Sequence, residues 1–393
     1  MKTFPIDLYK LIAFGLGGEN WQQFVDNYNE IYDTENIEGF EKVPTKLSYN
    51  WEQLLASTGA TPLPAYVDPE SPGYEFALKE VRGNIGNIPT FKAFYSLNRT
   101  ILRERLMLIN KMGEAALNSE MQNVFLGMID ETTEGLIKSY VNALTHQRMQ
   151  IVSKGQFTID SVNNPRGIQG VTIDFNIDST HKETLSGQDR WWTNSAHTTE
   201  GTSADPIGYI RKRLKEIKRT YHTNVPLQLE ISDVLWEDLK THTKVLTFLG
   251  WQTMTGVISA TDADALAAGK RILEAELLGK FAAAIGIPVK VRDSKACVLT
   301  PNASTHTLDE TYIDNFDEKN IAFVPQGKIG EIQGVSPLTL GYDSDKVAFF
   351  DGDRLALTQR ANPETHSIYI ESEAAQICVP TAINHMYIST VTL

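Results

Sequence analysis

Serine, histidine and carboxylate side chains at close spacing are the residues of this sequence that could carry out acyl transfer. Ser195, His197 and Glu200 stand within one short segment. A nucleophilic triad uses these three residue types, but it is defined by geometry, and neighbours on one loop rarely point at a common atom. The Gly-x-Ser-x-Gly motif, which presents a nucleophile on a sharp turn, is absent. A soluble hydrolase that uses His197 or a dispersed metal site remains the alternative from the enzyme class.

The other candidate residues do not form recognisable metal-binding or phosphate-binding motifs. The eight histidines form no His-Glu-x-x-His or His-x-His motif, and none pairs with a cysteine at ligand spacing. The segments 343–345 and 351–353 resemble parts of calcium loops without the final glutamate, and 15–18 lacks the Lys-Ser/Thr pair of a phosphate loop. Cys297 and Cys378 stand far apart, which predicts no disulfide framework and fits a reducing compartment. We expect no catalytic residues, no metal and no cofactor.

The composition indicates a folded, acidic protein. The chain has 393 residues, of which 41% are hydrophobic, and this is enough for a large core in two or three domains. Its net charge of −13 argues against wrapping nucleic acid by neutralising phosphates. The apolar run 11–16 is too short for a signal peptide, and no stretch approaches the roughly 18–20 apolar residues of a membrane span. We therefore expect no contact with a membrane.

One dense positive cluster interrupts this acidic chain. Arg211, Lys212 and Arg213 are followed by Lys215, Lys218 and Arg219, on a helix that Asp205-Pro206 is expected to open. The cluster is read as a solvated helix face, as a salt-bridge surface for an acidic neighbouring subunit, or as a contact with DNA. The sequence leaves these three interpretations open.

The first hundred residues contain apolar side chains without an evident core of their own. Trp21, Phe24, Tyr28 and Tyr32 recur at intervals of three and four, which predicts one face of a helix within an arm that needs a partner surface. Proline and glycine then cluster between residues 61 and 100. Two alternating runs there, Tyr74–Val81 and Thr90–Leu97, predict a long hairpin with Tyr74, Phe76 and Phe91 among its apolar residues. An isolated hairpin is marginal in water, so this one is expected to pack on another body.

Residues 114–153 carry the strongest helical signal. Leu117, Met121, Val124, Met128, Thr132, Leu136, Tyr140 and Leu144 step by three or four, and Lys154-Gly155 supplies a stop. The period changes to two over Phe157–Ile177, which predicts a hairpin with one buried face. A mixed α/β region follows. Its expected helices are 206–221, 232–240 and 261–285, and its expected strands, with those of the tail, are 226–231, 288–293, 321–324, 367–372, 376–379 and 385–393.

Several short motifs occur in a familiar order from the long helix onward. They are His146-Gln-Arg-Met with Val171–Phe175, Trp192, Asp205-Pro206, Trp236, Val245-Leu246, Leu278–Gly286, Val289–Asp293, Phe323–Gly330 and Ala375–Pro380. In this order the chain resembles the lambda-type major capsid protein family (protein E) of tailed phages, whose members have the Hong Kong 97-like fold. Residues 1–60 match least, and segment 294–320 is longer than the usual connection of the family.

The resemblance implies an α+β architecture. Its expected parts are an N-terminal arm (1–60), an extended β-hairpin or E-loop (61–100), a P-domain (101–203) with a spine helix (114–153), an α/β A-domain (204–361), and C-terminal strands (362–393) that return to the P-domain sheet. Subunit contacts are then expected from the arm, the hairpin and the basic helix. The residues are Trp21, Phe24, Tyr28, Tyr74, Phe76, Phe91, Arg211 and Arg213.

The function implied by the resemblance is structural rather than catalytic. Such a protein self-assembles as pentamers and hexamers into an icosahedral head shell that encloses double-stranded DNA without specific binding. Separate scaffolding and portal proteins, and possibly a decoration protein, are the expected partners. The expected location is the virion, after assembly in the host bacterial cytoplasm. A shell subunit of an encapsulin-like compartment is the alternative within the same fold.

Overall fold

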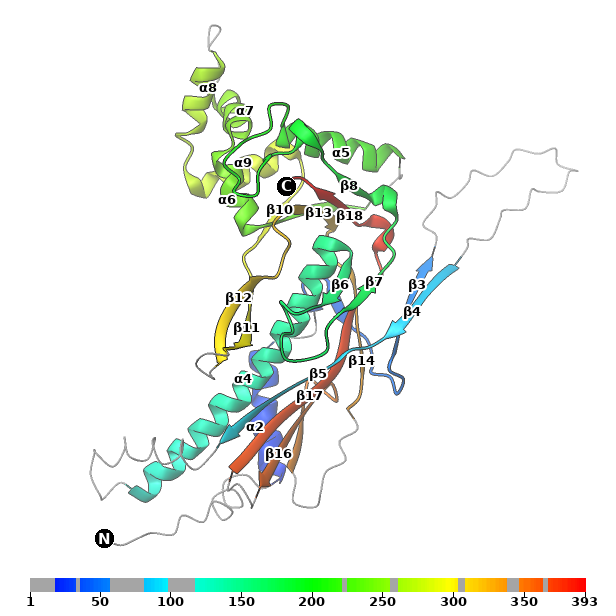
Figure 1. Cartoon of the computed structure of the whole chain (residues 1–393), viewed down its shortest axis with the longest axis vertical. Coiled ribbons are helices and arrows are strands. Elements are labelled where there is room, and N and C mark those ends of the chain that lie inside the picture. The colour runs from blue at the N-terminus through cyan, green and yellow to red at the C-terminus, as the bar shows by residue number, and fades with distance from the viewer. Residues whose placement is uncertain are drawn as a thin grey trace, which may run out of the picture. The chain divides into compact units, whose positions relative to one another are not determined.

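The computed structural model describes residues 18–32, 36–56, 81–97, 117–220, 225–254, 261–302, 308–337, 346–362 and 367–393. Helices and several separate sheets combine in these residues (Figure 1), so the expected α+β class is confirmed. The chain divides into two compact units, each made of discontinuous segments. Unit 1 comprises residues 1–51, 85–145 and 331–379, and unit 2 comprises residues 52–84, 146–330 and 380–393.

A seven-stranded sheet lies at the centre of unit 1. Its order is β1-β2-β14-β17-β16-β15, and β5 also pairs with β17. β16 and β5 run antiparallel to the same stretch of β17. The bounds are β1 (Asn36–Ile37), β2 (Phe40–Lys42), β5 (Thr90–Leu97), β14 (Gly330–Val335), β15 (Lys346–Phe350), β16 (Leu355–Asn362) and β17 (Ser367–Pro380).

Helix α2 (Gly18–Ile31) packs beside β15 of this sheet, although the two stand far apart in sequence (Figure 1). The Gln22 amide donates to the Phe349 carbonyl at 2.7 Å and accepts from the Phe349 N–H at 2.8 Å. Trp21 and Tyr28 are buried within the same unit. The expected helical face is therefore confirmed, but the expectation that a partner must cover it is wrong for these two side chains, because both are buried within this chain and the Tyr28 hydroxyl donates to the Asp130 carboxylate.

Helix α4 (Leu117–Lys154) confirms the long helix. Leu136, Tyr140 and Leu144 are buried, as their spacing predicts. The helix ends where the Gly155 N–H donates to the Ile151 carbonyl at 2.8 Å. Gly155 has φ +74°, a left-handed conformation that glycine adopts without steric penalty, so the sequence placed this stop correctly.

The two strands expected to form a hairpin between residues 61 and 100 do not pair with each other. Thr90–Leu97 is a strand, as predicted, but it joins β17 in the sheet of unit 1. β4 (Val81–Asn87) pairs instead with β3 (Asn50–Ala56), while residues 57–80, with most of the expected first strand, lie outside the described residues. The prediction was wrong because β17, the partner of β5, lies far along the chain, and the residues near β5 do not indicate this pairing.

A five-stranded sheet in the order β10-β9-β13-β18-β8 is the centre of unit 2. Every residue of β9 is buried, and β9 runs parallel to β10 and antiparallel to β13. The strands are β8 (Lys182–Thr184), β9 (Leu227–Ser232), β10 (Val289–Arg292), β13 (Asn320–Pro325) and β18 (Tyr387–Thr390). The helices are α5 (Pro206–Thr220), α6 (Asp233–Thr241), α7 (Thr243–Thr253), α8 (Asp262–Gly269) and α9 (Glu274–Ile285).

Three expectations for this region are corrected. The predicted helix 261–285 is two helices, α8 and α9, and the sequence missed α7. β15 and β16, placed by sequence in the α/β domain 204–361, belong to the sheet of unit 1. The tail also divides: β17 joins that sheet, whereas β18 completes the five-stranded sheet, so 362–393 does not return to one domain.

Two further ribbons stand outside the larger sheets. β6 (Gln156–Ile159) pairs only with β7 (Val171–Asp174) and does not share a sheet with the C-terminal strands, contrary to the expectation for the P-domain. β11 (Lys295–Pro301) and β12 (Leu308–Asp314) form a regular antiparallel ribbon. The ribbon occupies the segment that the sequence marked as unusually long. Short 3₁₀ turns complete the described structure at Ser179–His181, Gly187–Asp189 and Ile383–His385.

Candidate functional site

Two arginines and one glutamate form a buried cluster in unit 2. Both terminal nitrogens of Arg148, near the end of α4, donate to the carboxylate of Glu230 on β9 at 2.6 Å. Arg292 on β10 donates to the same carboxylate from Nε at 2.9 Å and from Nη2 at 2.8 Å. The side chains of Arg148 and Glu230 are fully buried. Paired donors of this kind give strong, directional hydrogen bonds.

The environment of Glu230 keeps it ionised. Burial alone would raise the pKa of this carboxyl, but the charge and hydrogen bonds of Arg148, with those of Arg292, outweigh burial and lower the pKa to about 2. Gln228 also donates to the carboxylate at 3.0 Å. The carboxylate is thus saturated with donors, so the cluster joins helix α4 to two strands of the sheet and has no free group for chemistry.

His197, the centre of the expected enzyme alternative, has both ring nitrogens engaged. Nδ1 contacts the Asp238 carboxylate, and Nε2 lies 3.0 Å from the Thr392 hydroxyl. The ring also stacks on Trp192 with centroids 5.2 Å apart. Glu200 accepts from the backbone N–H of Thr243 at 2.9 Å, away from this ring. A carboxylate, a histidine and a hydroxyl are therefore in line, but the hydroxyl belongs to Thr392, which is buried, and not to the expected Ser195.

The described part of the chain contains no cluster of side chains suited to bind a metal ion. No group of three or more His, Cys, Asp or Glu side chains there could hold an ion. His146 illustrates the ordinary use of a histidine in this fold: its Nδ1 lies 2.8 Å from the Asn315 side-chain oxygen, and burial lowers its pKa. Among the described helices, none is both long and apolar enough to cross a membrane.

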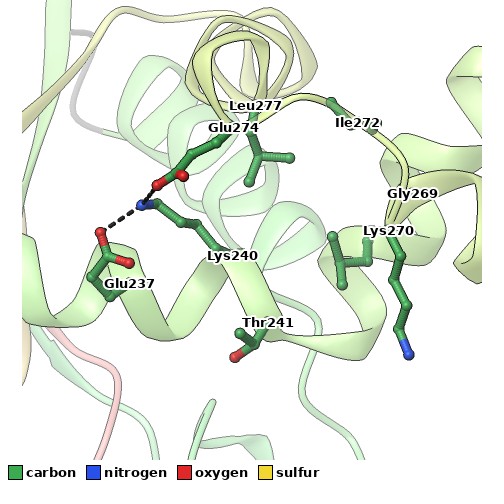
Figure 2. Close-up of a pocket in the computed structure, with 9 residues that line it drawn as sticks. Glu237, Lys240, Thr241, Gly269, Lys270, Ile272, Glu274 and Leu277 are labelled. Atoms are coloured by element: carbon green, nitrogen blue, oxygen red, sulfur yellow. Dashed lines mark hydrogen bonds and ion pairs between the residues drawn. The ribbon is translucent and has the colours of Figure 1, made fainter.

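A pocket of about 590 Å³ lies among the helices of unit 2 (Figure 2). Lys240 extends between Glu237 and Glu274 and forms an ion pair with each (Figure 2). The hydrogen bonds to these two carboxylates raise the pKa of Lys240, so this amine stays charged and cannot serve as a base near neutral pH. The lining residues are Glu237, Lys240, Thr241, Leu246, Gly269, Lys270, Ile272, Glu274 and Leu277.

The residues expected to contact other subunits are distributed over both units. Trp21 and Tyr28 are buried in unit 1, as described above, while the side chain of Phe24 and the whole of Tyr74 and Phe76 lie outside the described residues. Phe91 packs against the ring of Tyr140 with centroids 6.1 Å apart. Contacts of these residues with other subunits stay a prediction.

The basic cluster on α5 separates into inward and outward side chains. Arg213 is buried and forms an ion pair with Glu216 at 2.9 Å, so its guanidinium already has a partner within the chain, and its contact with another subunit stays a prediction. Arg211 is exposed but donates from Nε to the Ala284 carbonyl at 2.6 Å, and its guanidinium lies over the Phe248 ring at 4.8 Å. A contact of Arg211 with another copy remains a prediction.

Some of the exposed large apolar side chains lie on the two-stranded ribbons, while others, such as Leu47 and Phe94, lie elsewhere. Ile85 on β4 and Tyr312 on β12 expose 71% and 63% of their surface, and Leu299 and Leu308 on the same ribbon as Tyr312 are also exposed. Val162, in the connection between β6 and β7, is exposed as well. Sequence reasoning missed the β11–β12 ribbon, whose strands do not show a regular alternation of apolar and polar residues.

No family model matches the chain, and no curated protein matches it either. Among solved structures, a phage-related protein from Bordetella bronchiseptica is 12% identical over 93% of this chain and 96% of its own, with a TM-score of 0.43. The putative capsid protein of a prophage of Escherichia coli is 12% identical over 100% and 99%, with a TM-score of 0.43. The mature capsid of bacteriophage PhiM1 is 9% identical over 91% and 87%, with a TM-score of 0.41.

Proposed function

We propose that this chain is the major capsid protein of a tailed phage, a subunit of Hong Kong 97-like fold that assembles into the icosahedral head shell. The solved structures named above include capsid proteins, and the proposal gives this chain the same role. Its support is the structure of the chain itself. The order of elements, with an N-terminal helix, a two-stranded ribbon, a long helix and an α/β unit, agrees with the order that the sequence resemblance implied.

The observation that carries the proposal is the exposure of apolar residues on ribbons that have only two strands. A two-stranded ribbon is marginally stable alone in water. Contiguous exposed apolar surface marks a place where another molecule binds. Leu299 and Tyr312 are exposed on β11–β12, and Ile85 is exposed on β3–β4. Neighbouring copies in a shell would cover these ribbons and complete their sheets or cores.

The finer parts of the proposal concern domains and partners. We assign unit 1, with its seven-stranded sheet and most of α4, to the peripheral domain, and the α/β unit 2 to the axial domain. Copies then form pentamers and hexamers in a virion shell that is assembled in the bacterial cytoplasm with scaffolding, portal and decoration proteins. The net charge of −13 suits a shell that encloses double-stranded DNA without binding it specifically.

Substitution of the ribbon residues tests this function. Ile85→Ser combined with Leu299→Ser and Tyr312→Ser should leave the circular dichroism spectrum unchanged, because these side chains contribute little to the core of one copy. Covering each apolar side chain is worth about 1.5–3 kcal/mol, so particle yield in sedimentation should fall by more than about tenfold. Leu273→Ser is the control, since Leu273 is equally exposed but lies outside the ribbons. Normal particle yield from the triple variant would contradict the proposal.

A further inference from the structure

The outward face of α5 carries positive charge that the chain does not neutralise within its described residues. The helix has six basic residues and one acidic residue, and its opposite face is buried. Lys212, Lys215, Lys218 and Arg219 are exposed, and none of them forms an ion pair with a described residue. Like charges three and four positions apart on a helix destabilise it, so an external counter-charge would stabilise α5.

The β11–β12 ribbon presents the complementary chemistry. Its register pairs Cys297 with Tyr312 and Leu299 with Glu310, and because side chains alternate across a strand these four share one face. All four residues are exposed. The same face carries the carboxylates of Glu310 and Asp314 against the single Lys295, which pairs with Asp314 at 3.3 Å, whereas Asp309 lies opposite Thr300 on the other face. This face is therefore apolar with an acidic margin.

The two surfaces belong to the same unit but lie apart on it. Figure 1 shows β11–β12 extending from one side of unit 2 while α5 lies at the other side. The ribbon of a copy therefore does not cover α5 of that copy. Complementary patches at separate places on one subunit produce a head-to-tail contact, and such contacts close into rings when the rotation between copies permits.

We propose that the β11–β12 ribbon of one copy docks on the exposed face of α5 of a second copy. The carboxylates of the ribbon then lie against Lys212, Lys215 and Lys218, and burial of Leu299 and Tyr312 supplies the apolar part of the contact. The inference rests on the proposed function, because a shell supplies the neighbouring copy. Opposite charges at such a contact select the partner and its orientation, and the contact weakens as salt concentration rises.

Charge reversal tests the contact on the full chain. The variant Lys212→Glu/Lys215→Glu/Lys218→Glu, and separately Glu310→Lys/Asp314→Lys, should each lower particle yield by about tenfold or more, since like charges then face each other. The variant that combines both sets should recover most of the yield, because the charges are again opposite. Recovery separates a direct contact from a general loss of folding.

Disulfide cross-linking gives a second, independent measurement. The chain has two cysteines, of which Cys297 is exposed on the ribbon and Cys378 is buried. Lys215→Cys treated with diamide should produce disulfide-linked multimers on a non-reducing gel through Cys297 of the neighbouring copy. Glu276→Cys, an exposed position on α9, is the matched control and should give only the background of the unchanged chain.

The outcomes distinguish this contact from the proposed function. If the unchanged chain forms particles but both reversal variants assemble normally and Lys215→Cys links no better than Glu276→Cys, the contact is overturned while the shell function stands. If the α5 variant assembles normally but binds double-stranded DNA more weakly in a gel-shift assay, α5 contacts nucleic acid and the contact is likewise overturned. If the unchanged chain forms no particles, the shell function fails and this contact fails with it.

Discussion

Replacing Glu230 with glutamine is expected to lower the free energy of unfolding by about 3–5 kcal/mol, because removing one partner from a buried ion cluster leaves the other charges uncompensated. Glutamine keeps the volume but removes the negative charge between Arg148 and Arg292, both of which donate to it at 2.6–2.9 Å. Urea denaturation of the unassembled chain, followed by circular dichroism, measures the change.

Glu237→Gln is the matched control for this variant. Glu237 is exposed and forms an ion pair with Lys240, so its loss should change stability by less than about 0.5 kcal/mol. Replacement of the whole cluster, as Arg148→Met/Glu230→Leu/Arg292→Met, should recover most of the loss because no charge then remains buried. Equal stability of Glu230→Gln and Glu237→Gln would show that the cluster does not hold α4 to the sheet.

The same carboxylate gives a defined pH dependence. Its pKa in the folded chain, about 2, lies below the ordinary value of 4.5, so its stabilising contribution is complete above about pH 4.5 and is lost as pH falls towards 2. That contribution amounts to about 3 kcal/mol. The unchanged chain should therefore lose stability over this window more steeply than Glu230→Gln. If the free energy of unfolding fell equally with pH in the two proteins between pH 4.5 and 2, the lowered pKa of Glu230 would be contradicted.

Gly250→Ala is expected to destabilise unit 2 by about 3 kcal/mol, at the upper end of the usual cost of overpacking, because the new methyl group meets rigid backbone. A Cβ at Gly250 would lie 1.7 Å from the Ala265 carbonyl oxygen, and one at Gly269 would lie 2.0 Å from the Leu246 carbonyl oxygen. Helices α7 and α8 thus approach each other through glycine on both sides. Thermal unfolding of the unassembled variant measures the cost.

Gly279→Ala is the control, because it is expected to raise the stability that Gly250→Ala lowers. Gly279 lies within α9, and a Cβ there meets no atom within 4 Å. Alanine in a helix interior is about 0.5–1 kcal/mol more favourable than glycine, so this variant should be slightly more stable than the unchanged chain. A Gly250→Ala variant as stable as Gly279→Ala would show that α7 and α8 are not in this close contact.

Local signals explain what the sequence predicted well. The long helix followed from side chains that recur every three or four residues and from the stop at Gly155, which the structure places in the left-handed conformation that favours glycine. α5 and α6 were predicted from Pro206 and Ser232 at their first turns, and Ser232 accepts a hydrogen bond from the Leu235 N–H at 3.1 Å. Such features act within a few residues and need no knowledge of the rest of the fold.

Distant pairing explains what the sequence could not predict. β5 was expected in a hairpin, but its partner is β17, and Trp21 was expected to need another copy, but it is buried within this chain. The break between α8 and α9 lies beside Gly269, whose close approach to α7 is a tertiary contact that local spacing does not reveal. Glu230 within an apolar strand was the one available signal for the buried cluster, since a lone charge there requires partners.

Interaction surfaces were predicted least well, because exposure depends on the whole fold. The aromatic residues of α2 have a typical interface composition, yet Trp21 and Tyr28 serve the core of unit 1. Conversely, the β11–β12 ribbon lies in a segment whose structure the sequence left open, and its Tyr312 is largely exposed. Arg211 and Arg213 share one short motif, but only Arg213 turns into the unit.

Sedimentation velocity of the purified full-length chain, with negative-stain electron microscopy of the fastest fraction, tests the shell function most directly. The proposed function predicts closed particles that contain many copies and that dissociate when the ribbon residues Ile85, Leu299 and Tyr312 are replaced by serine. A single species of 43.9 kDa at every concentration and salt condition, with no larger assembly in the images, would contradict it.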